Sequence, residues 1–257
     1  MTRYASRRVL ALFPHPDDEA YAAGGLLARC AEGGAAVELV CATRGERGTD
    51  RSGTAAAGPA LAALRTRELE TSCHALGIAA PVFLDLPDGD LGGRTRADAV
   101  ALVTHHVHRV RPHLLVTLGS DGAYGHLDHL AWTAIVSLAL APLAEGSRLL
   151  HAVFPRRLFA PVWRALKRRA GARLVAAIDP QTLGVVADGV DLRLDIRRVR
   201  GRKLAAISAH RSQLVDGDPY SFLRPGLVEC LLDEEWYMVA RGPALPRGTT
   251  DPFDGLR

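Results

Sequence analysis

The sequence predicts an α/β fold with a doubly wound, mostly parallel sheet and helices on both of its faces. Short apolar runs alternate with longer segments of helical character through the first 150 of the 257 residues. The apolar runs are bounded by glycine, proline or polar residues, as buried strands are. Alternation this regular is typical of parallel β-α units.

The elements can be placed in order along the chain. Arg8–Phe13 is apolar and is cut off by proline, which indicates a buried strand, and the helix-forming run Glu19–Ala31 follows it. Thr95 and Asp98 resemble a capping pair for a helix that Pro112 ends. The other expected elements are a strand at 37–42, a mobile loop at 49–60, a helix at 61–76, a strand at 81–86, a helix at 95–110, a strand at 114–118, an apolar helix to about 141 and a strand at 149–154.

The chain becomes less regular from about residue 150. A basic helix, an alternating strand near 190–196 and a helix at 197–210 are expected there. No internal repeat and no linker composition marks a boundary, so a single domain over 1–257 is predicted.

Composition excludes several classes of function. An apolar fraction of 48% and a charged fraction of 23% are ordinary for a soluble globular protein, and no apolar run approaches the ~18 residues of a membrane span. The N-terminus lacks a secretory signal, so a cytoplasmic protein is expected. The net charge is +4, but the arginines are dispersed, so nucleic acid is not an expected partner. The oligomeric state cannot be predicted from these features.

Phe13–Glu19 is the first stretch that suggests chemistry. It joins the end of a predicted strand to the start of a helix, where open α/β sheets carry their active sites. His15 and Asp18 are three residues apart, so they can face the same side of a first helical turn. Asp17 then points elsewhere and is available for proton transfer.

A second stretch, Tyr124–His129, also follows a strand and opens a helix. His126 and His129 repeat the three-residue spacing. The first and fourth strands of a doubly wound sheet are usually neighbours, so the two loops are expected to meet. Two histidines and one carboxylate with an open fourth position are typical of a catalytic zinc site, with His15, Asp18 and His129 as its ligands.

The remaining polar groups of the two loops then have roles. Asp17 can accept a proton from water, and His126 can donate one or stabilise an oxyanion. Asp128 can fix the tautomer of a histidine. Each residue alone also has a non-catalytic explanation. Asp128 can be a helix cap, and His126 can be an ordinary surface histidine.

Together these stretches resemble the PIG-L/LmbE family of zinc-dependent de-N-acetylases. The resemblance covers most of the chain in order. It is carried by Pro14–Glu19, Thr43–Glu46, Arg65–Glu68, Ala75–Gly77, Leu86–Gly89, Gly125–His129 and His210–Gln213. Residues 155–189 match nothing in the family.

The resemblance implies a Rossmann-like fold and removal of the acetyl group from an N-acetylglucosamine-type glycoside. It implies one zinc ion per chain, or another divalent metal such as Fe2+, and Asp17 as the general base. It further implies that Tyr124 and His126 flank the oxyanion and that Arg65 and Asp88 hold sugar hydroxyls. Arg44, in the matching Thr43–Glu46 stretch, is also expected to contact the substrate.

Other functions remain open. A mycothiol-conjugate-type amidase is the nearest alternative, because it suits the same class of pocket. A non-haem iron oxygenase uses the same ligand types, but it gives Asp17 no role. A non-catalytic carbohydrate-binding protein is a third reading, although every polar group expected of an enzyme is present.

Overall fold

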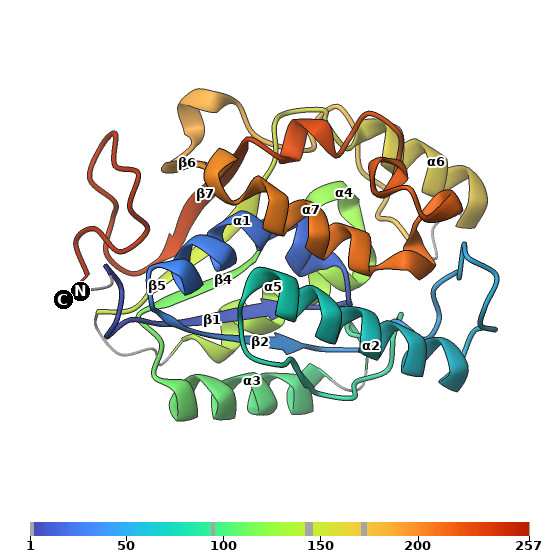
Figure 1. Ribbon diagram of the computed structural model, residues 1–257, viewed down its shortest axis with the longest axis horizontal. Helices are drawn as coiled ribbons and strands as arrows, with labels where there is room; N and C mark the ends of the chain where they lie inside the picture. Colours follow the sequence, from blue (N-terminus) through green and yellow to red (C-terminus); the bar gives the residue numbers. More distant parts are fainter. Residues whose placement is uncertain (1–2, 94–95, 142–145, 171–173, 257) are drawn as a thin grey trace. The chain divides into compact units, whose positions relative to one another are not determined.

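The computed structural model describes residues 3–93, 96–141, 146–170 and 174–256 (Figure 1). The chain divides into two compact units, each built from two stretches of sequence. The first contains Met1–Asp88 and Asp195–Glu235, and the second contains Gly89–Leu194 and Trp236–Arg257. The expectation of a single domain over 1–257 remains a prediction.

The first unit contains three neighbouring parallel strands in the order β3, β2, β1. Their bounds are Arg8–Phe13 for β1, Ala36–Cys41 for β2 and Val82–Phe83 for β3. Residues Val9 to Phe13 are completely buried, which is why this strand is an unbroken apolar run.

Three helices accompany these strands. They are α1 (Asp18–Glu32), α2 (Pro59–Leu76) and α7 (Arg200–Ala209). In Figure 1, α7, drawn in orange, runs alongside α1, drawn in blue, and it also contacts α2. Residues far apart in the sequence are thereby brought to the N-terminal end of α1.

The second unit contains the strands β4 (Leu114–Leu118) and β5 (Arg148–Val153), which pair in parallel. Most of β7 (Glu234–Arg241) belongs to it and pairs antiparallel with β5, and β6 (Leu192–Asp195) adjoins β7. Its helices are α3 (Arg96–Val110), the short α4 (Gly122–Gly125), α5 (Leu127–Ala139) and α6 (Ala160–Ala170). Alternating helices and mostly parallel strands confirm the predicted α/β class.

The predicted element boundaries need two corrections. The strand expected at 81–86 is only Val82–Phe83, because Asp85 adopts a left-handed conformation with φ of 54° that breaks the extended chain. The helix expected at 197–210 begins with one 3-10 turn before α7. The predicted Thr95 cap of α3 lies outside the described residues.

The strand β7 was not predicted. Its first residues are Glu234 and Glu235, so no apolar run marks its start. Glu235 is nevertheless buried, because its carboxylate accepts hydrogen bonds from the Lys203 ammonium at 2.7 Å and from the Gly25 and Leu26 N–H groups. A buried carboxylate needs such partners, because an unpaired charge taken out of water is strongly destabilising.

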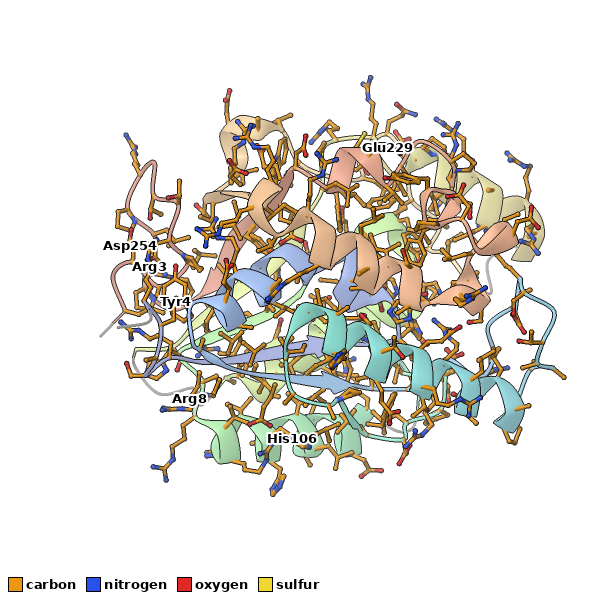
Figure 2. The ribbon with its side chains drawn as sticks, viewed as in Figure 1. Arg3, Tyr4, Arg8, His106, Glu229 and Asp254 are labelled. Atoms are coloured by element: carbon orange, nitrogen blue, oxygen red, sulfur yellow. The ribbon has the colours of Figure 1, made fainter. Side chains whose placement is uncertain are left out.

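The N-terminal residues are anchored to the end of α1. The Tyr4 N–H donates to the Gly33 carbonyl at 2.7 Å, and a Cβ atom at Gly33 would lie 2.2 Å from the Tyr4 ring. Only glycine allows this close approach. The Arg3 guanidinium lies over the same ring, 5.3 Å from its centroid (Figure 2). Among the described residues, no helix is long and apolar enough to cross a membrane.

Candidate active site

The loop after β1 brings His15 and Asp18 together, as their spacing predicts. The backbone N–H of His15 donates to Asp18 Oδ2 at 3.0 Å, and the ring nitrogen Nδ1 of His15 lies 3.4 Å from the same oxygen. The Tyr21 hydroxyl donates to Asp18 Oδ1 at 3.0 Å. Both His15 and Asp18 are buried. Their side chains are therefore held as a pair on one side of the first turn of α1.

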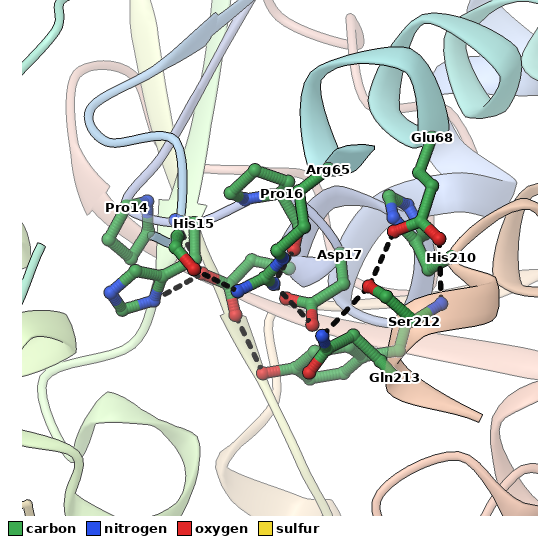
Figure 3. A network of polar contacts seen from close by, with 12 residues as sticks. Pro14, His15, Pro16, Asp17, Arg65, Glu68, His210, Ser212 and Gln213 are labelled. Atoms are coloured by element: carbon green, nitrogen blue, oxygen red, sulfur yellow. Dashed lines mark hydrogen bonds and ion pairs between the residues drawn. The ribbon is translucent and has the colours of Figure 1, made fainter. Parts of the chain in front are cut away.

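Asp17 points away from that pair and toward α2. Its φ of 116° is a strained conformation for a residue with a side chain, of the kind that costs about 1–3 kcal/mol. Arg65 donates to Asp17 Oδ2 at 2.9 Å (Figure 3), and the Asp17 N–H donates to Glu19 Oε2 at 3.0 Å. Burial raises the pKa of Asp17 to about 7, although the Arg65 guanidinium opposes this shift. A carboxyl group with this pKa can exchange protons at neutral pH.

Asp88 lies on the other side of His15. Its Oδ1 is 3.2 Å from His15 Nε2, and its Oδ2 accepts the Arg47 N–H at 2.8 Å. Burial disfavours the charged carboxylate, but the hydrogen bond and charge of His15 outweigh it and hold the pKa of Asp88 well below its usual range. Asp88 is therefore an ionised acceptor that orients the His15 ring.

The guanidinium of Arg65 contacts the protein itself. Besides Asp17, it donates to the Pro16 carbonyl and, at 3.2 Å, to the Gly45 carbonyl. Arg44 lies 2.6 Å from Asp85 and donates to Thr66 Oγ1 at 2.7 Å. The substrate contacts expected of Arg65, Asp88 and Arg44 remain predictions.

The second loop belongs to the second unit, and a tight turn shapes it. Gly122 and Ala123 both have positive φ, at 59° and 62°, before α5 begins. His129, on the first turn of α5, is completely buried, and its Nδ1 lies 3.1 Å from the Gly122 carbonyl oxygen. A carbonyl oxygen can only accept, so this nitrogen carries the hydrogen and the lone pair is on Nε2. Nε2 is the atom that can bind a metal.

His126 is the N-terminal cap of α5. Its Nδ1 accepts the Asp128 N–H at 3.2 Å, so Nε2 carries the hydrogen in the neutral ring. The His126 and His129 rings lie 4.6 Å apart between centroids, and the Tyr124 ring is 5.1 Å from that of His129. The structure thus groups Tyr124 with both histidines, as expected.

Asp128 does not act as the helix cap, because His126 fills that position. Its carboxylate instead accepts the Gly89 N–H at 2.7 Å and the Leu91 N–H at 3.2 Å. These bonds hold the turn that follows Asp88. The expected contact between this carboxylate and a histidine remains a prediction.

Residues 155–189, which resemble nothing in the family, contact the second loop. The Leu127 N–H donates to the Leu174 carbonyl at 3.0 Å, and the Ala176 N–H donates to the Gly125 carbonyl at 2.8 Å. The Phe159 ring lies 5.9 Å from that of Tyr124. This segment therefore supports the His126 loop, a role that its sequence did not indicate.

A buried polar network in the first unit was also missed, and Figure 3 labels three of its members, Glu68, His210 and Ser212. Its members are Glu19, Glu68, Ser72, His210 and Ser212, all buried. The His210–Gln213 stretch was recognised only through its resemblance to the family. No spacing rule could have linked His210 to Glu19, since 191 residues separate them.

The structure thus brings the predicted residues together in two groups. His15, Asp17, Asp18, Arg65 and Asp88 form one group in the first unit. Tyr124, His126, Asp128 and His129 form the other in the second unit. Arg44 lies apart, against Asp85 and Thr66.

Comparison with known proteins identifies a common family. A family model described as "PIG-L: GlcNAc-PI de-N-acetylase" matches residues 10–140. A protein of Nakamurella multipartita named 1D-myo-inositol 2-acetamido-2-deoxy-alpha-D-glucopyranoside deacetylase is 32% identical over 94% of this chain and 92% of its own. A protein of the same name from Rhodococcus erythropolis is 31% identical over 98% of both chains.

Solved structures share the fold. N,N'-diacetylchitobiose deacetylase from Pyrococcus horikoshii has a TM-score of 0.60 at 23% identity and covers 94% of this chain and 88% of its own. The 4-carboxy-2-hydroxymuconate hydratase from Pseudomonas putida has a TM-score of 0.64 at 20% identity, covering 95% of this chain and 100% of its own. The same fold therefore accompanies two reactions, and the function must be argued from the site.

Proposed function

Since the chain belongs to the PIG-L family of de-N-acetylases, we propose that it hydrolyses the acetamide of a 2-acetamido-2-deoxyglucoside, giving acetate and the free amine. The observation that carries this proposal is the match to relatives named as deacetylases over nearly the whole chain, together with the acidic and histidine side chains that the two loops supply. Membership also makes the chain a metal-dependent amide hydrolase.

The proposed metal ligands are His15 and Asp18 of the first unit and His129 of the second, holding one zinc ion. The residues fit such an ion in their chemistry, because two imidazoles and a carboxylate are typical zinc ligands and all three are buried. His15 Nδ1 and Asp18 Oδ2 are 3.4 Å apart, a separation that suits two ligands of one ion with bonds of about 2.1 Å. His129 presents the lone pair of Nε2. Fe2+ is the alternative ion.

The ion would supply Lewis-acid catalysis, and the protein groups would move the protons. We assign the role of general base to Asp17, whose pKa of about 7 suits proton transfer from water at neutral pH. His126 carries a hydrogen on Nε2, so we assign it to the oxyanion or to the departing nitrogen, with Tyr124 beside it. Arg65 holds the base, and Asp88 holds His15.

The proposed substrate class follows the relatives. Both are named as deacetylases of an inositol-linked 2-acetamido-2-deoxyglucoside, so we propose that a glucosaminide with a small polar aglycone is accepted here. Correct placement of the acetamide contributes much of the rate, because a misplaced carbonyl gains little from the catalytic groups.

A substrate panel tests the proposal. The zinc-loaded chain is incubated with N-acetylglucosamine, its inositol glycoside, N,N'-diacetylchitobiose and a cysteinyl amide conjugate, and acetate and free amine are measured. We expect acetate from the inositol glycoside, and none after chelation of the metal. The proposal is wrong if no sugar of the panel releases acetate. Preferential cleavage of the cysteinyl amide would instead support the mycothiol-conjugate amidase.

A further inference from the structure

Glu19 links Asp17 to a histidine at the far end of the sequence. One oxygen of its carboxylate, Oε2, accepts the Asp17 N–H at 3.0 Å. The other, Oε1, lies 2.7 Å from His210 Nε2. We propose that Glu19 and His210 are positioning residues for Asp17, holding its backbone in the conformation that aims the carboxylate. The inference rests on the proposed function, in which Asp17 is the base.

Asp17 needs such support because its backbone is strained. At a φ of 116° a residue with a side chain stays in place only when its surroundings fix it. The Glu19 carboxylate accepts the Asp17 N–H, and Arg65 donates to Asp17 Oδ2 at 2.9 Å. The backbone and the side chain of Asp17 are therefore both held in place. Loss of the Glu19 contact would let the backbone relax and turn the carboxylate away.

Glu19 itself is oriented by two donors on its other oxygen. Ser72 Oγ donates to Oε1 at 2.5 Å, beside His210 Nε2. With Oε1 engaged in this way, Oε2 faces the Asp17 N–H. Glu19 and His210 are both completely buried, so each needs the other as a partner. Burial disfavours the charged form of His210, but the Glu19 carboxylate outweighs this effect and raises the pKa of the imidazole.

Helix α2 organises the same support. Arg65, Glu68 and Ser72 recur at spacings of three and four residues and lie on one helical face. Arg65 contacts Asp17 and Ser72 contacts Glu19, while Glu68 accepts the Ser212 N–H at 2.6 Å and its hydroxyl at 2.7 Å. The turn that carries His210 is thus fixed to the helix that carries the other supports (Figure 3). The His210–Gln213 stretch, which the catalytic scheme did not use, acquires a role.

The test compares two substitutions of Glu19 with a matched control. Glu19→Ala removes the acceptor for the Asp17 N–H, whereas Glu19→Gln keeps an oxygen in its place. Ser208→Ala removes a hydroxyl that donates to the Leu204 carbonyl within α7, two residues before His210, and it has no part in the proposed support. Each zinc-loaded protein is assayed with the inositol glycoside of N-acetylglucosamine for kcat and KM. Metal content is measured on the same samples.

We expect Glu19→Ala to lower kcat about 10- to 100-fold at unchanged KM and metal content, the scale of a small misplacement of a catalytic group. Glu19→Gln should recover most of kcat, and Ser208→Ala should stay within about twofold of the parent. If Glu19→Ala fails to fold, His210→Gln and Ser72→Ala test the same point, because each leaves Glu19 less firmly oriented. Both should lower kcat at unchanged KM.

Three results would overturn the inference. One is a kcat for Glu19→Ala, or for both substitute variants, within twofold of the parent. The second is a loss of metal in proportion to the loss of activity, which would assign Glu19 to the support of Asp18. The third is Glu19→Gln being no better than Glu19→Ala. An unmodified protein that releases no acetate contradicts the proposed function instead, so the two failures are distinguishable.

Discussion

Replacing Asp88 by asparagine tests whether this carboxylate orients His15 or holds the sugar. Asp88 accepts two hydrogen bonds, one from His15 Nε2 at 3.2 Å and one from the Arg47 N–H at 2.8 Å. Asparagine has one oxygen for these two donors, so its amide group must face one of them. Where it faces the imidazole, the ring proton moves from Nε2 to Nδ1. Nδ1 is the nitrogen beside Asp18 that we propose as the ligand.

The expected effect is a loss of metal affinity. Removing the partner that fixes the tautomer of a histidine ligand costs about 10- to 100-fold in affinity. This corresponds to about 1.4–2.7 kcal/mol. Zinc dissociation constants are measured by competition with a chromogenic chelator. Asp85→Asn serves as the matched control, because Asp85 lies in the same loop but its ion pair is with Arg44.

The opposite outcome is equally clear. If Asp88→Asn binds zinc as tightly as the parent but raises KM for glycosides, Asp88 holds sugar hydroxyls and does not control His15. The reasoning from the His15 contact would then be refuted, and the role implied by the family resemblance would stand.

Three other predictions concern the metal, the base and pH. His129→Ala should lower bound metal from about one ion per chain to near zero by elemental analysis, and full retention of metal and activity would disprove the ligand assignment. Asp17→Asn should keep the metal and lose about 100-fold or more in kcat, whereas near-normal turnover would move the proton transfer to another group such as Glu19. Because the pKa of His210 is raised in the folded protein, its pairing with Glu19 stabilises the fold. This stabilisation is present in full at pH values below the unfolded pKa of about 6.5. That contribution is lost as pH rises through the folded pKa. The free energy of unfolding in urea should therefore differ between the parent and His210→Gln at about pH 6, and the difference should shrink as the pH rises above this value. A difference independent of pH would contradict this.

The sequence predicts the elements whose causes are local. Arg8–Phe13 and Leu114–Leu118 are apolar runs between breakers, and both form strands with the expected bounds. The pairing of His15 with Asp18 follows from their spacing, and it is observed. Asp17 faces away from that pair, as the same geometry requires.

Contacts between distant segments could not be predicted in this way. Glu235 is an acidic residue that no apolar run marks as buried. It is nevertheless buried, because Lys203 and the N–H groups of α1 pair with it. Arg65 was assigned to the sugar by resemblance, whereas its observed partners are Asp17 and two backbone carbonyls. Both cases depend on which side chains the fold brings together, and hydrophobic periodicity carries no such information.

Asp17, Asp18 and Glu19 show how the fold gives chemically similar neighbours different surroundings. All three are acids at one helix N-terminus, where the helix dipole favours negative charge. Arg65 of α2 pairs with Asp17, His15 of the preceding loop lies against Asp18, and His210 from the end of α7 pairs with Glu19. A carboxylate beside a second metal-binding side chain suits a metal, a strained one beside an arginine suits proton transfer, and a completely buried one beside a histidine suits support. The partners, supplied by three different segments, therefore decide which of the proposed roles each acid suits.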